Sequence, residues 1–122
     1  MTETNAAIGQ RGEELAISYL RKNGFLIASR NWRAGRYEID VVAQKMGITH
    51  LIEVKTRKAG SLVSPEASIT PAKANAMRRA ARAYVGQNRI VGEVSIDLVA
   101  IDMFPDGSHH LRFIEQAVEF GW

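Results

Sequence analysis

Three residues, Asp40, Glu53 and Lys55, have the types and spacing that metal-assisted chemistry requires. Each lies in a segment that alternates apolar and polar residues, as a β-strand does when its side chains point to opposite faces. A tight turn at Met46-Gly47 would join the two segments as a hairpin and place Asp40 directly opposite Glu53. Two carboxylates that face each other repel, so this pairing predicts a divalent cation that compensates them.

The chemistry of such a site would be cleavage of a phosphodiester bond. Mg²⁺ or Mn²⁺ prefers oxygen ligands, here Asp40, Glu53 and the Val54 carbonyl, and it activates water and neutralises charge on the phosphate. Lys55 would orient the attacking water or stabilise the pentavalent transition state. The alternative is a cross-strand ion pair between Glu38 and Lys55, which explains the lysine but leaves the facing carboxylates unexplained.

Glu13 is a candidate for a third carboxylate at this site. In a helix it shares a face with Ala16, Ile17 and Leu20, at the edge of the apolar stripe that faces the core. A glutamate in that place is costly unless it is paired or binds a metal ion. Glu13 is therefore a candidate metal ligand; the alternatives are an ion pair with an arginine of the sheet and a simple place at the margin of the stripe.

Basic residues are grouped around these carboxylates, although the net charge of the chain is only +3. Such grouping suits a polyanion that is bound and then cut, and the alternative is an ordinary solvated surface. Trp32 could stack on a base or anchor a hairpin in the core. The residues that we expect to contact nucleic acid are Arg33, Arg57, Lys73, Arg78 and Arg82, of which the last two are one helical turn apart.

The composition limits the class of protein. A chain of 122 residues with 46% hydrophobic and 24% charged residues predicts a single folded domain over residues 1–122. Because the chain has no cysteine, disulfides, thiolate nucleophiles and cysteine-ligated metals are excluded. Neither a secretory signal nor a run of about 20 apolar residues is visible. We therefore expect a soluble, cytoplasmic protein with no membrane partner.

The hydrophobic periodicity predicts an α/β (α+β) domain with a central mixed sheet of about five strands flanked by helices. Thr70-Pro71 is a strong helix start, since threonine caps a helix and proline suits its first position. A crossover helix allows the strand after it to pair parallel to strand 49–56. The order is α-β-β-β-α-β-β-α, with a helix over 5–23, a strand over 25–30, a loop over 31–35, strands over 37–45 and 49–56, a mobile loop over 59–68, a helix over 70–87, a strand over 93–101, a turn at 105–107, a short strand over 109–113 and a short helix over 115–120.

The chain carries six short motifs: Gly9-Gln-Arg-Gly-Glu13-Glu-Leu-Ala16, Arg30-Asn-Trp-Arg33, Glu38-Ile-Asp40, Glu53-Val-Lys55-Thr-Arg57, Pro71-Ala-Lys73 and Ile96-Asp-Leu98. In this order and spacing they resemble the YraN-like family of uncharacterised bacterial proteins over nearly the whole chain. Members are predicted to belong to the PD-(D/E)xK nuclease superfamily and are similar to archaeal Holliday junction resolvases. The resemblance implies a restriction-endonuclease-like core with Glu13, Asp40, Glu53 and Lys55 as the site. Tyr37 departs from the glycine usual in relatives, and it could narrow the approach to the site.

Glu38 and Asp97 are candidates for residues that support the site from outside it. Asp97 lies in an apolar strand, where it could accept a hydrogen bond or serve the fold near a turn. His109 and His110 are adjacent, so a strand would point them to opposite faces and keep both from binding one metal ion. The C-terminal apolar residues Ile114, Val118, Phe120 and Trp122 could pack on the sheet or form a homodimer contact.

These patterns lead to three hypotheses. The first is a magnesium-dependent endonuclease that acts on DNA, including branched or damaged structures. The second is a non-catalytic module that keeps the nuclease fold and binds nucleic acid, since a fold does not by itself imply an activity. The third is an adaptor that binds proteins through its aromatic C-terminal segment. The first two predict binding to nucleic acid that weakens with salt.

Overall fold

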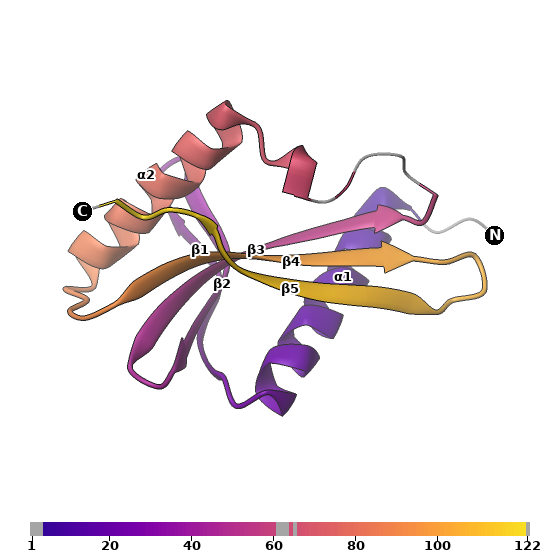
Figure 1. Cartoon of the computed structure of the whole chain (residues 1–122), viewed down its shortest axis with the longest axis horizontal. Coiled ribbons are helices and arrows are strands. Elements are labelled where there is room, and N and C mark those ends of the chain that lie inside the picture. Colours follow the sequence, from indigo (N-terminus) through magenta and orange to yellow (C-terminus); the bar gives the residue numbers. More distant parts are fainter. Residues whose placement is uncertain (1–3, 61–63, 65, 122) are drawn as a thin grey trace.

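The computed structural model describes residues 4–60, 64 and 66–121, and it consists of a five-stranded sheet between two helices (Figure 1). This arrangement confirms the predicted α+β class with a central mixed sheet. The elements in chain order are α1 (Asn5–Lys22), β1 (Leu26–Ala34), β2 (Tyr37–Lys45), β3 (Ile48–Lys58), the short 3₁₀ helix η1 (Glu66–Ser68), α2 (Pro71–Gln87), β4 (Val94–Met103) and β5 (His109–Val118).

The strands lie side by side in chain order, from β1 to β5. Strands β3 and β4 are parallel, and each other neighbouring pair is antiparallel. Helix α2 separates β3 from β4 in the sequence and forms the crossover that parallel pairing requires. The predicted parallel pairing is therefore confirmed, and the sheet brings the start of β2 and the middle of β3 close to the start of α2.

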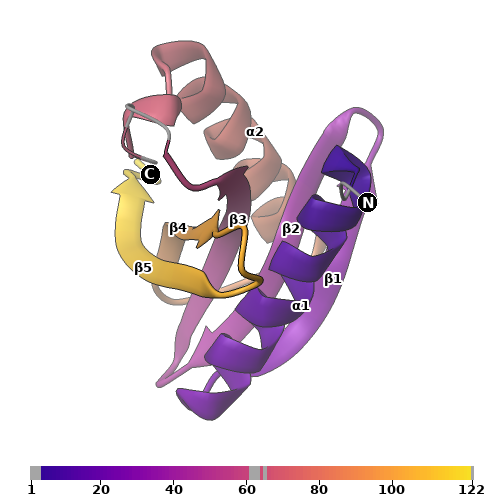
Figure 2. The same cartoon turned by 90° about the vertical axis from the view of Figure 1, so that its right-hand side faces the viewer.

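The two helices cover opposite faces of the sheet, as Figure 2 shows. Each helix begins at a threonine whose hydroxyl accepts a hydrogen bond from the first turn, Thr4 at 3.0 Å and Thr70 at 3.1 Å. Ile17 and Leu20 fix α1 on one core, and Met77 fixes α2 on the other. The Thr70 cap confirms the predicted start of the second helix.

Residues of β2 do not keep to one face along the whole strand. Val41 packs in the core beneath α1, whereas Ile39 packs in the core beneath α2. The strict alternation expected from the sequence would put these two residues on the same face, and at this place that alternation fails. The change of face falls at Asp40, the residue between them. Asp40 therefore lies where the strand turns from one core to the other.

The side chains of strand β1 also change face, at Asn31, which lies beside Asp40 of β2. Arg30 reaches Glu14 of α1 at 2.6 Å, but Trp32, two residues later, packs edge-on against Tyr84 of α2 with ring centres 5.2 Å apart. Asn31, between them, has a positive φ of 52°, which asparagine tolerates better than most residues. The outer half of the β1–β2 hairpin is thereby directed toward α2. Trp32 therefore anchors the hairpin in the core, which is one of the two roles predicted for it.

Two predicted elements are wrong in their bounds or type. The loop over 31–35 is mostly strand, because Trp32, Arg33 and Ala34 pair with β2 and leave a tight turn at Gly35. The helix over 115–120 is also wrong: β5 continues to Val118, since the edge of β4 offers backbone partners that a helix would leave unpaired. Within the predicted mobile loop, residues 61–63 and 65 lie outside the described residues, and 66–68 form η1.

Candidate functional site

Asp40 and Glu53 lie where β2 and β3 separate. The two strands pair in the predicted register, from Lys45–Ile48 to Val41–Ile52. One residue further on, the Asp40 carboxylate accepts a hydrogen bond of 2.8 Å from the backbone N–H of Val54. The Asp40 carboxylate thus takes the place of a backbone carbonyl in the hydrogen bonding between β2 and β3. The two strands separate at this point, and the side chains of Asp40 and Glu53 lie beside a cleft.

The cleft has a volume of about 370 Å³ and runs between the first half of α1, the start of β2 and the end of β3. The structure brings all four predicted catalytic residues to its wall, namely Glu13, Asp40, Glu53 and Lys55. Arg57, which we expect to contact nucleic acid, also lines it. The site therefore combines residues from three elements, from Glu13 in α1 through Asp40 in β2 to Arg57 in β3.

Close contact between α1 and β3 places Glu13 at the cleft. Gly12 is buried directly against Thr56, and a Cβ atom added to Gly12 would lie 2.9 Å from the Thr56 Cβ. Real Cβ atoms do not approach so closely, so any larger residue would push the helix from the strand. Gly9, one turn earlier, has open space around it. Gly12, which directly precedes Glu13, thus sets the distance between Glu13 and β3.

Glu13 has a buried oxygen without a protein partner. Among the described residues, its Oε1 is the buried side-chain oxygen or nitrogen atom that lacks a hydrogen-bond partner. One predicted alternative for Glu13 is an ion pair with an arginine of the sheet. That ion pair is formed by the next residue instead, because Arg30 pairs with Glu14 at 2.6 Å. A buried acceptor of this kind calls for a water molecule or a cation.

The electrostatics of the cleft favour an added positive charge. Burial, followed by the negative charge of Glu53, raises the pKa of Asp40 from 3.8 to about 6. The hydrogen bond from Val54 lowers this pKa, and the charges of Glu13 and Glu38 raise it further. The partly buried carboxylate of Asp40 therefore lies near three other negative charges. A charged Asp40 in such surroundings is costly unless a cation offsets the repulsion.

Lys73 supplies a cation to Glu53. Its Nζ lies 2.9 Å from Glu53 Oε1, with the two side chains 46% and 22% exposed. Burial alone would lower the pKa of the Lys73 ammonium, but its hydrogen bond to Glu53 and the nearby charges of Glu53, Asp40 and Glu38 raise it overall. The sequence indicates Lys73 as a residue that contacts nucleic acid, but no local pattern predicts its contact with Glu53, because the two residues lie in different elements.

Lys55 and Glu38 do not form the ion pair that was the alternative explanation for Lys55. Glu38 pairs instead with Arg33 across β1 and β2, at 3.3 Å and with both side chains largely exposed. Lys55 is exposed at the cleft, and within residues 4–60, 64 and 66–121 no carboxylate pairs with it. Its ammonium group therefore remains available to an anion in the cleft.

The donor set fits a magnesium or manganese ion, although it is not a closed cage. Across the part of the chain that the structure describes, no three His, Cys, Asp or Glu side chains are close enough to hold a metal together. Mg²⁺ keeps several waters and needs only one or two carboxylates. Asp40 and Glu53 meet that need, and the unpartnered oxygen of Glu13 could accept from a metal-bound water.

The remaining predicted nucleic-acid contacts have partners within the protein. Arg57 pairs with Asp102 at 2.7 Å beside the cleft. On α2, the Arg78 guanidinium donates to the Glu119 carbonyl oxygen at 2.9 Å, and Arg82 donates to the Gly121 carbonyl oxygen at 3.2 Å. These two arginines hold the C-terminal segment against α2. Their role toward nucleic acid stays a prediction, with fewer free donors than the sequence indicated.

Asp97 forms a network of its own rather than supporting Asp40 or Glu53. It is fully buried, and its Oδ2 accepts from Nδ1 of His50 at 2.6 Å. Its Oδ1 accepts from the Ser95 hydroxyl at 2.5 Å and from the Gln116 backbone N–H at 3.0 Å. The prediction of a hydrogen-bond acceptor holds, but the partners belong to β3, β4 and β5. The sequence gives no sign of this role for His50, since no local pattern marks a histidine that pairs across 47 positions.

The C-terminal segment packs on the protein's own core. Val118 and Phe120 are buried beneath α2, which is the first of the two roles expected for them. Trp122 lies outside the described residues. His109 and His110 pair with successive residues of β4, so they point to opposite faces as expected. No helix in the described part of the chain is both long and apolar enough to cross a membrane.

Comparison with known proteins shows the family. Residues 12–101 match the uncharacterised protein family UPF0102. The chain belongs to this family, which confirms the YraN-like resemblance. The matched region contains all four residues of the cleft that were predicted to be catalytic, and it ends within β4.

Members of UPF0102 from several bacteria are similar over most of the chain. A relative from Syntrophomonas wolfei is 38% identical over 93% of this chain and 98% of its own length. One from Bacteroides fragilis is 33% identical over 96% and 95%. One from Oleidesulfovibrio alaskensis is 46% identical over 67% of this chain but only 41% of its own length. The relatives carry the family name without an activity.

Proposed function

We propose that this protein is a magnesium-dependent endonuclease that hydrolyses phosphodiester bonds in DNA. The observation that carries the proposal is the meeting of Asp40 and Glu53 at a cleft, beside a buried Glu13 oxygen that has no protein partner. Neither a structural ion pair nor a solvated surface explains why Asp40 is held, partly buried, beside the charge of Glu53, where its pKa is raised to about 6.

Each residue of the cleft has a distinct part in this proposal. A bound Mg²⁺ or Mn²⁺ would supply an activated water and neutralise charge on the phosphate. Asp40 and Glu53 would hold the ion, and Glu13 would orient a water molecule through its free oxygen. Lys55, which has no carboxylate partner among the described residues, would stabilise the negative charge that develops on the phosphate.

Cleavage assays on defined substrates test the proposal. Purified protein with Mg²⁺ or Mn²⁺ should cut at least one member of a panel of duplex, flapped, branched and damaged DNA, with matched RNA included. Asp40→Ala and Glu53→Ala should lower the rate by roughly a hundredfold or more. Glu13→Gln should also slow cleavage, whereas Glu14→Gln, on the solvent side of the same helix, should not. Cleavage that Asp40→Ala leaves intact would rule the proposal out.

Metal binding can be measured without a substrate. Calorimetric titration of Mn²⁺ into the wild type should give a binding signal that disappears in Asp40→Ala/Glu53→Ala. Glu14→Gln is again the control, because Glu14 pairs with Arg30 away from the cleft. Binding that persists in the double variant would place the metal elsewhere and contradict the assignment of these two ligands.

A second candidate is a module that binds nucleic acid without cutting it. The observation that favours it is the Lys73–Glu53 ion pair, because an ammonium group already neutralises one of the two metal ligands at 2.9 Å. In that case, binding should weaken as salt rises and should be unchanged by Asp40→Ala, with no cleavage by any variant. Lys73→Ala would then weaken binding without exposing a metal-dependent activity.

A further inference from the structure

A second groove lies on the other side of Glu53 from the cleft. It has a volume of about 390 Å³ and runs between the turn of the β1–β2 hairpin and residues 73–80 of α2. Glu53 lines both the groove and the cleft, so the two cavities meet at this carboxylate. The groove is lined on the hairpin side by Arg36 and Tyr37 and on the helix side by Lys73 and Arg79.

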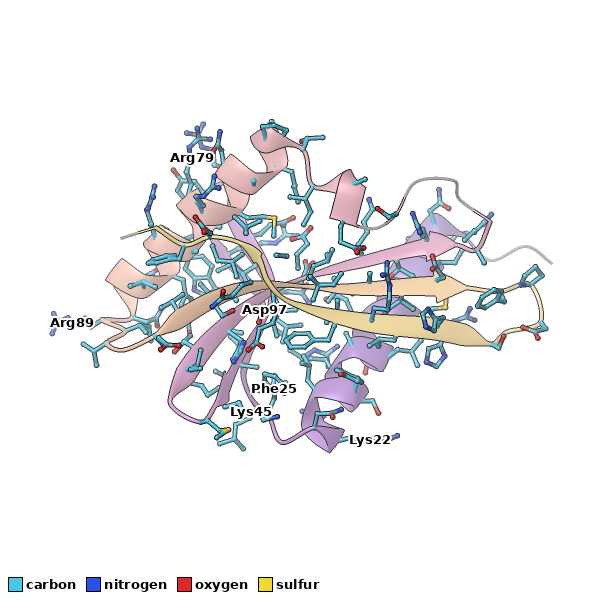
Figure 3. All side chains as sticks on the ribbon, in the orientation of Figure 1. Lys22, Phe25, Lys45, Arg79, Arg89 and Asp97 are labelled. Carbon is cyan, nitrogen blue, oxygen red and sulfur yellow. The ribbon has the colours of Figure 1, made fainter. Side chains whose placement is uncertain are left out.

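The charges in the groove favour an anion. Its two carboxylates have cationic partners, since Glu38 pairs with Arg33 and Glu53 pairs with Lys73. Two further cations, Arg36 and Arg79, face the groove, and among the described residues neither has a carboxylate partner. Arg79 projects from the outer side of α2, well away from Lys22 and Arg89 (Figure 3). The groove therefore has two arginines that no carboxylate of the described residues neutralises and that can contact phosphate groups.

The hairpin side of the groove also offers a flat surface. The Arg36 guanidinium carbon lies 5.8 Å from the centre of the Tyr37 ring, and Tyr37 is only partly buried. Guanidinium planes and aromatic rings are the surfaces on which unpaired bases stack. A base in a duplex is already stacked between its neighbours and cannot use such a surface. The combination of a stacking surface with phosphate-binding cations is typical of sites for single strands.

The dimensions of the groove agree with this assignment. A cavity of about 390 Å³ between a hairpin turn and a helix lies near the lower end of the range for small-ligand sites. It has room for about one unpaired nucleotide, whereas a double helix is far too wide to enter it. The bend of the hairpin toward α2, which begins at Asn31 and Asp40, forms this narrow space.

We propose that the groove between Arg36, Tyr37 and Arg79 binds a single DNA strand next to the phosphate that the cleft receives. Lys73 lies at the border of the two cavities, where it can contact the phosphate that joins the bound nucleotide to the cut one. This inference rests on the proposed nuclease function and deepens it. The substrate class becomes DNA in which a single strand leaves a duplex, such as a flap or an overhang.

Binding measurements on a non-cleaving variant test the groove separately from catalysis. In an Asp40→Asn background, fluorescence anisotropy would compare a flapped duplex, a blunt duplex of the same sequence and a free single strand. The Arg36→Gln/Arg79→Gln variant should bind the flap and the single strand roughly tenfold more weakly. The slope of log affinity against log salt should fall by about 1.4, since each lost contact to a single strand removes about 0.7. The blunt duplex should be affected least.

A matched variant controls for net charge. Lys22→Gln/Arg89→Gln removes the same two charges from sites that lie away from the groove, and it should change every affinity by less than twofold (Figure 3). Tyr37→Leu should weaken flap binding without changing the salt slope, because it removes stacking and no charge. Equal losses in the two charge variants, or equal losses on flap and blunt duplex, would overturn the proposal.

The outcomes separate this inference from the proposed function. Flap-selective binding that depends on Arg36 and Arg79, in a protein that never cleaves, would support the groove and refute the nuclease. Metal-dependent cleavage with the same rates on flapped and blunt DNA, unaffected by Arg36→Gln/Arg79→Gln, would support the nuclease and refute the groove. Absence of any salt-dependent binding to DNA would overturn both.

Discussion

Asp40 and Asp97 are both aspartates of the central sheet, yet their surroundings differ. Asp97, near the middle of the molecule in Figure 3, is fully buried and accepts hydrogen bonds from His50, Ser95 and the backbone of Gln116. Asp40 accepts one hydrogen bond from the backbone and otherwise faces other carboxylates. One carboxylate is satisfied by the protein, and the other is left to be satisfied by something that the protein binds.

The difference separates a structural role from a functional one. A buried carboxylate with all its partners in place stabilises one arrangement of three strands and has nothing to offer a ligand. A carboxylate held near like charges lowers the stability of the folded protein, and such a cost is typical of sites that bind or react. Each prediction below tests whether a residue belongs to the first kind of environment or to the second.

The largest effect is expected from removing the satisfied carboxylate. Asp97→Ala leaves His50, Ser95 and the Gln116 N–H without their acceptor, and we expect a loss of about 3–5 kcal/mol in the free energy of unfolding. Urea unfolding measures it. Glu115→Ala, on the exposed side of the same sheet, should stay within about 0.5 kcal/mol of wild type. An unchanged urea midpoint for Asp97→Ala would show that this hydrogen-bond network does not stabilise the fold.

The unsatisfied carboxylate should behave in the opposite way. Because the pKa of Asp40 rises from 3.8 to about 6, metal-free Asp40→Asn should be more stable than wild type at neutral pH, by about 1–3 kcal/mol. Asparagine has no charge to bury and can still accept the bond from Val54.

The sign of the pH dependence follows from proton binding. Between pH 3.8 and about 6 the native carboxyl of Asp40 holds its proton while the unfolded one loses it, so the contribution of Asp40 to wild-type stability falls as pH rises through this window. Relative to wild type, Asp40→Asn should gain stability over the same window and show no gain below it. Urea unfolding at several pH values, with a chelator present, measures the difference. A wild type that gains on the variant as pH rises would contradict the assignment.

An effect of similar size is expected at the contact that places Glu13. Gly12→Ala meets Thr56 and should lower the free energy of unfolding by about 1–3 kcal/mol, and it should weaken Mn²⁺ binding by moving the helix. Gly9→Ala, in the same helix with open space around it, should instead raise stability by about 0.4–1 kcal/mol. Thermal unfolding compares the two, and equal effects would mean that the close approach of α1 to β3 is not needed.

The smallest effect separates two adjacent arginines of α2. Arg78→Ala removes hydrogen bonds to the Glu119 carbonyl and to Asn75, and it should lower the free energy of unfolding by about 0.5–1.5 kcal/mol. Arg79→Ala should change it by less than about 0.5 kcal/mol, because Arg79 faces the groove. Denaturant unfolding and DNA binding together distinguish the two residues. A stability loss for Arg79→Ala equal to that for Arg78→Ala would give both arginines a structural role.

Much of the fold and the positions of the main candidates could be predicted from local patterns. Alternation along β2 and β3 and the symmetry of the turn between them gave the register next to Asp40 and Glu53. Helical spacing put Glu13 at the edge of the core. These predictions hold because they depend on residues within a single hairpin or a single helix, where backbone geometry alone decides which side chains are neighbours.

The errors arise where distant partners decide the structure. The residues after Phe113 continue as a strand because β4 offers them an edge, and no local pattern in them announces that edge. The change of face at Asp40 depends on the packing of the outer hairpin beneath α2. In both places a contact between elements outweighs the local preference of the chain.

The sequence by itself determined the mixed α+β class, the family, and a set of acidic and basic residues with the types that phosphate chemistry uses. The tertiary structure alone decided which of those residues meet. Lys73 returns to Glu53 from a different element, and Asp97 is removed from the site by His50, 47 positions away. The physical reason is that local sequence fixes the direction of each side chain, whereas charge and burial depend on what the rest of the chain brings beside it.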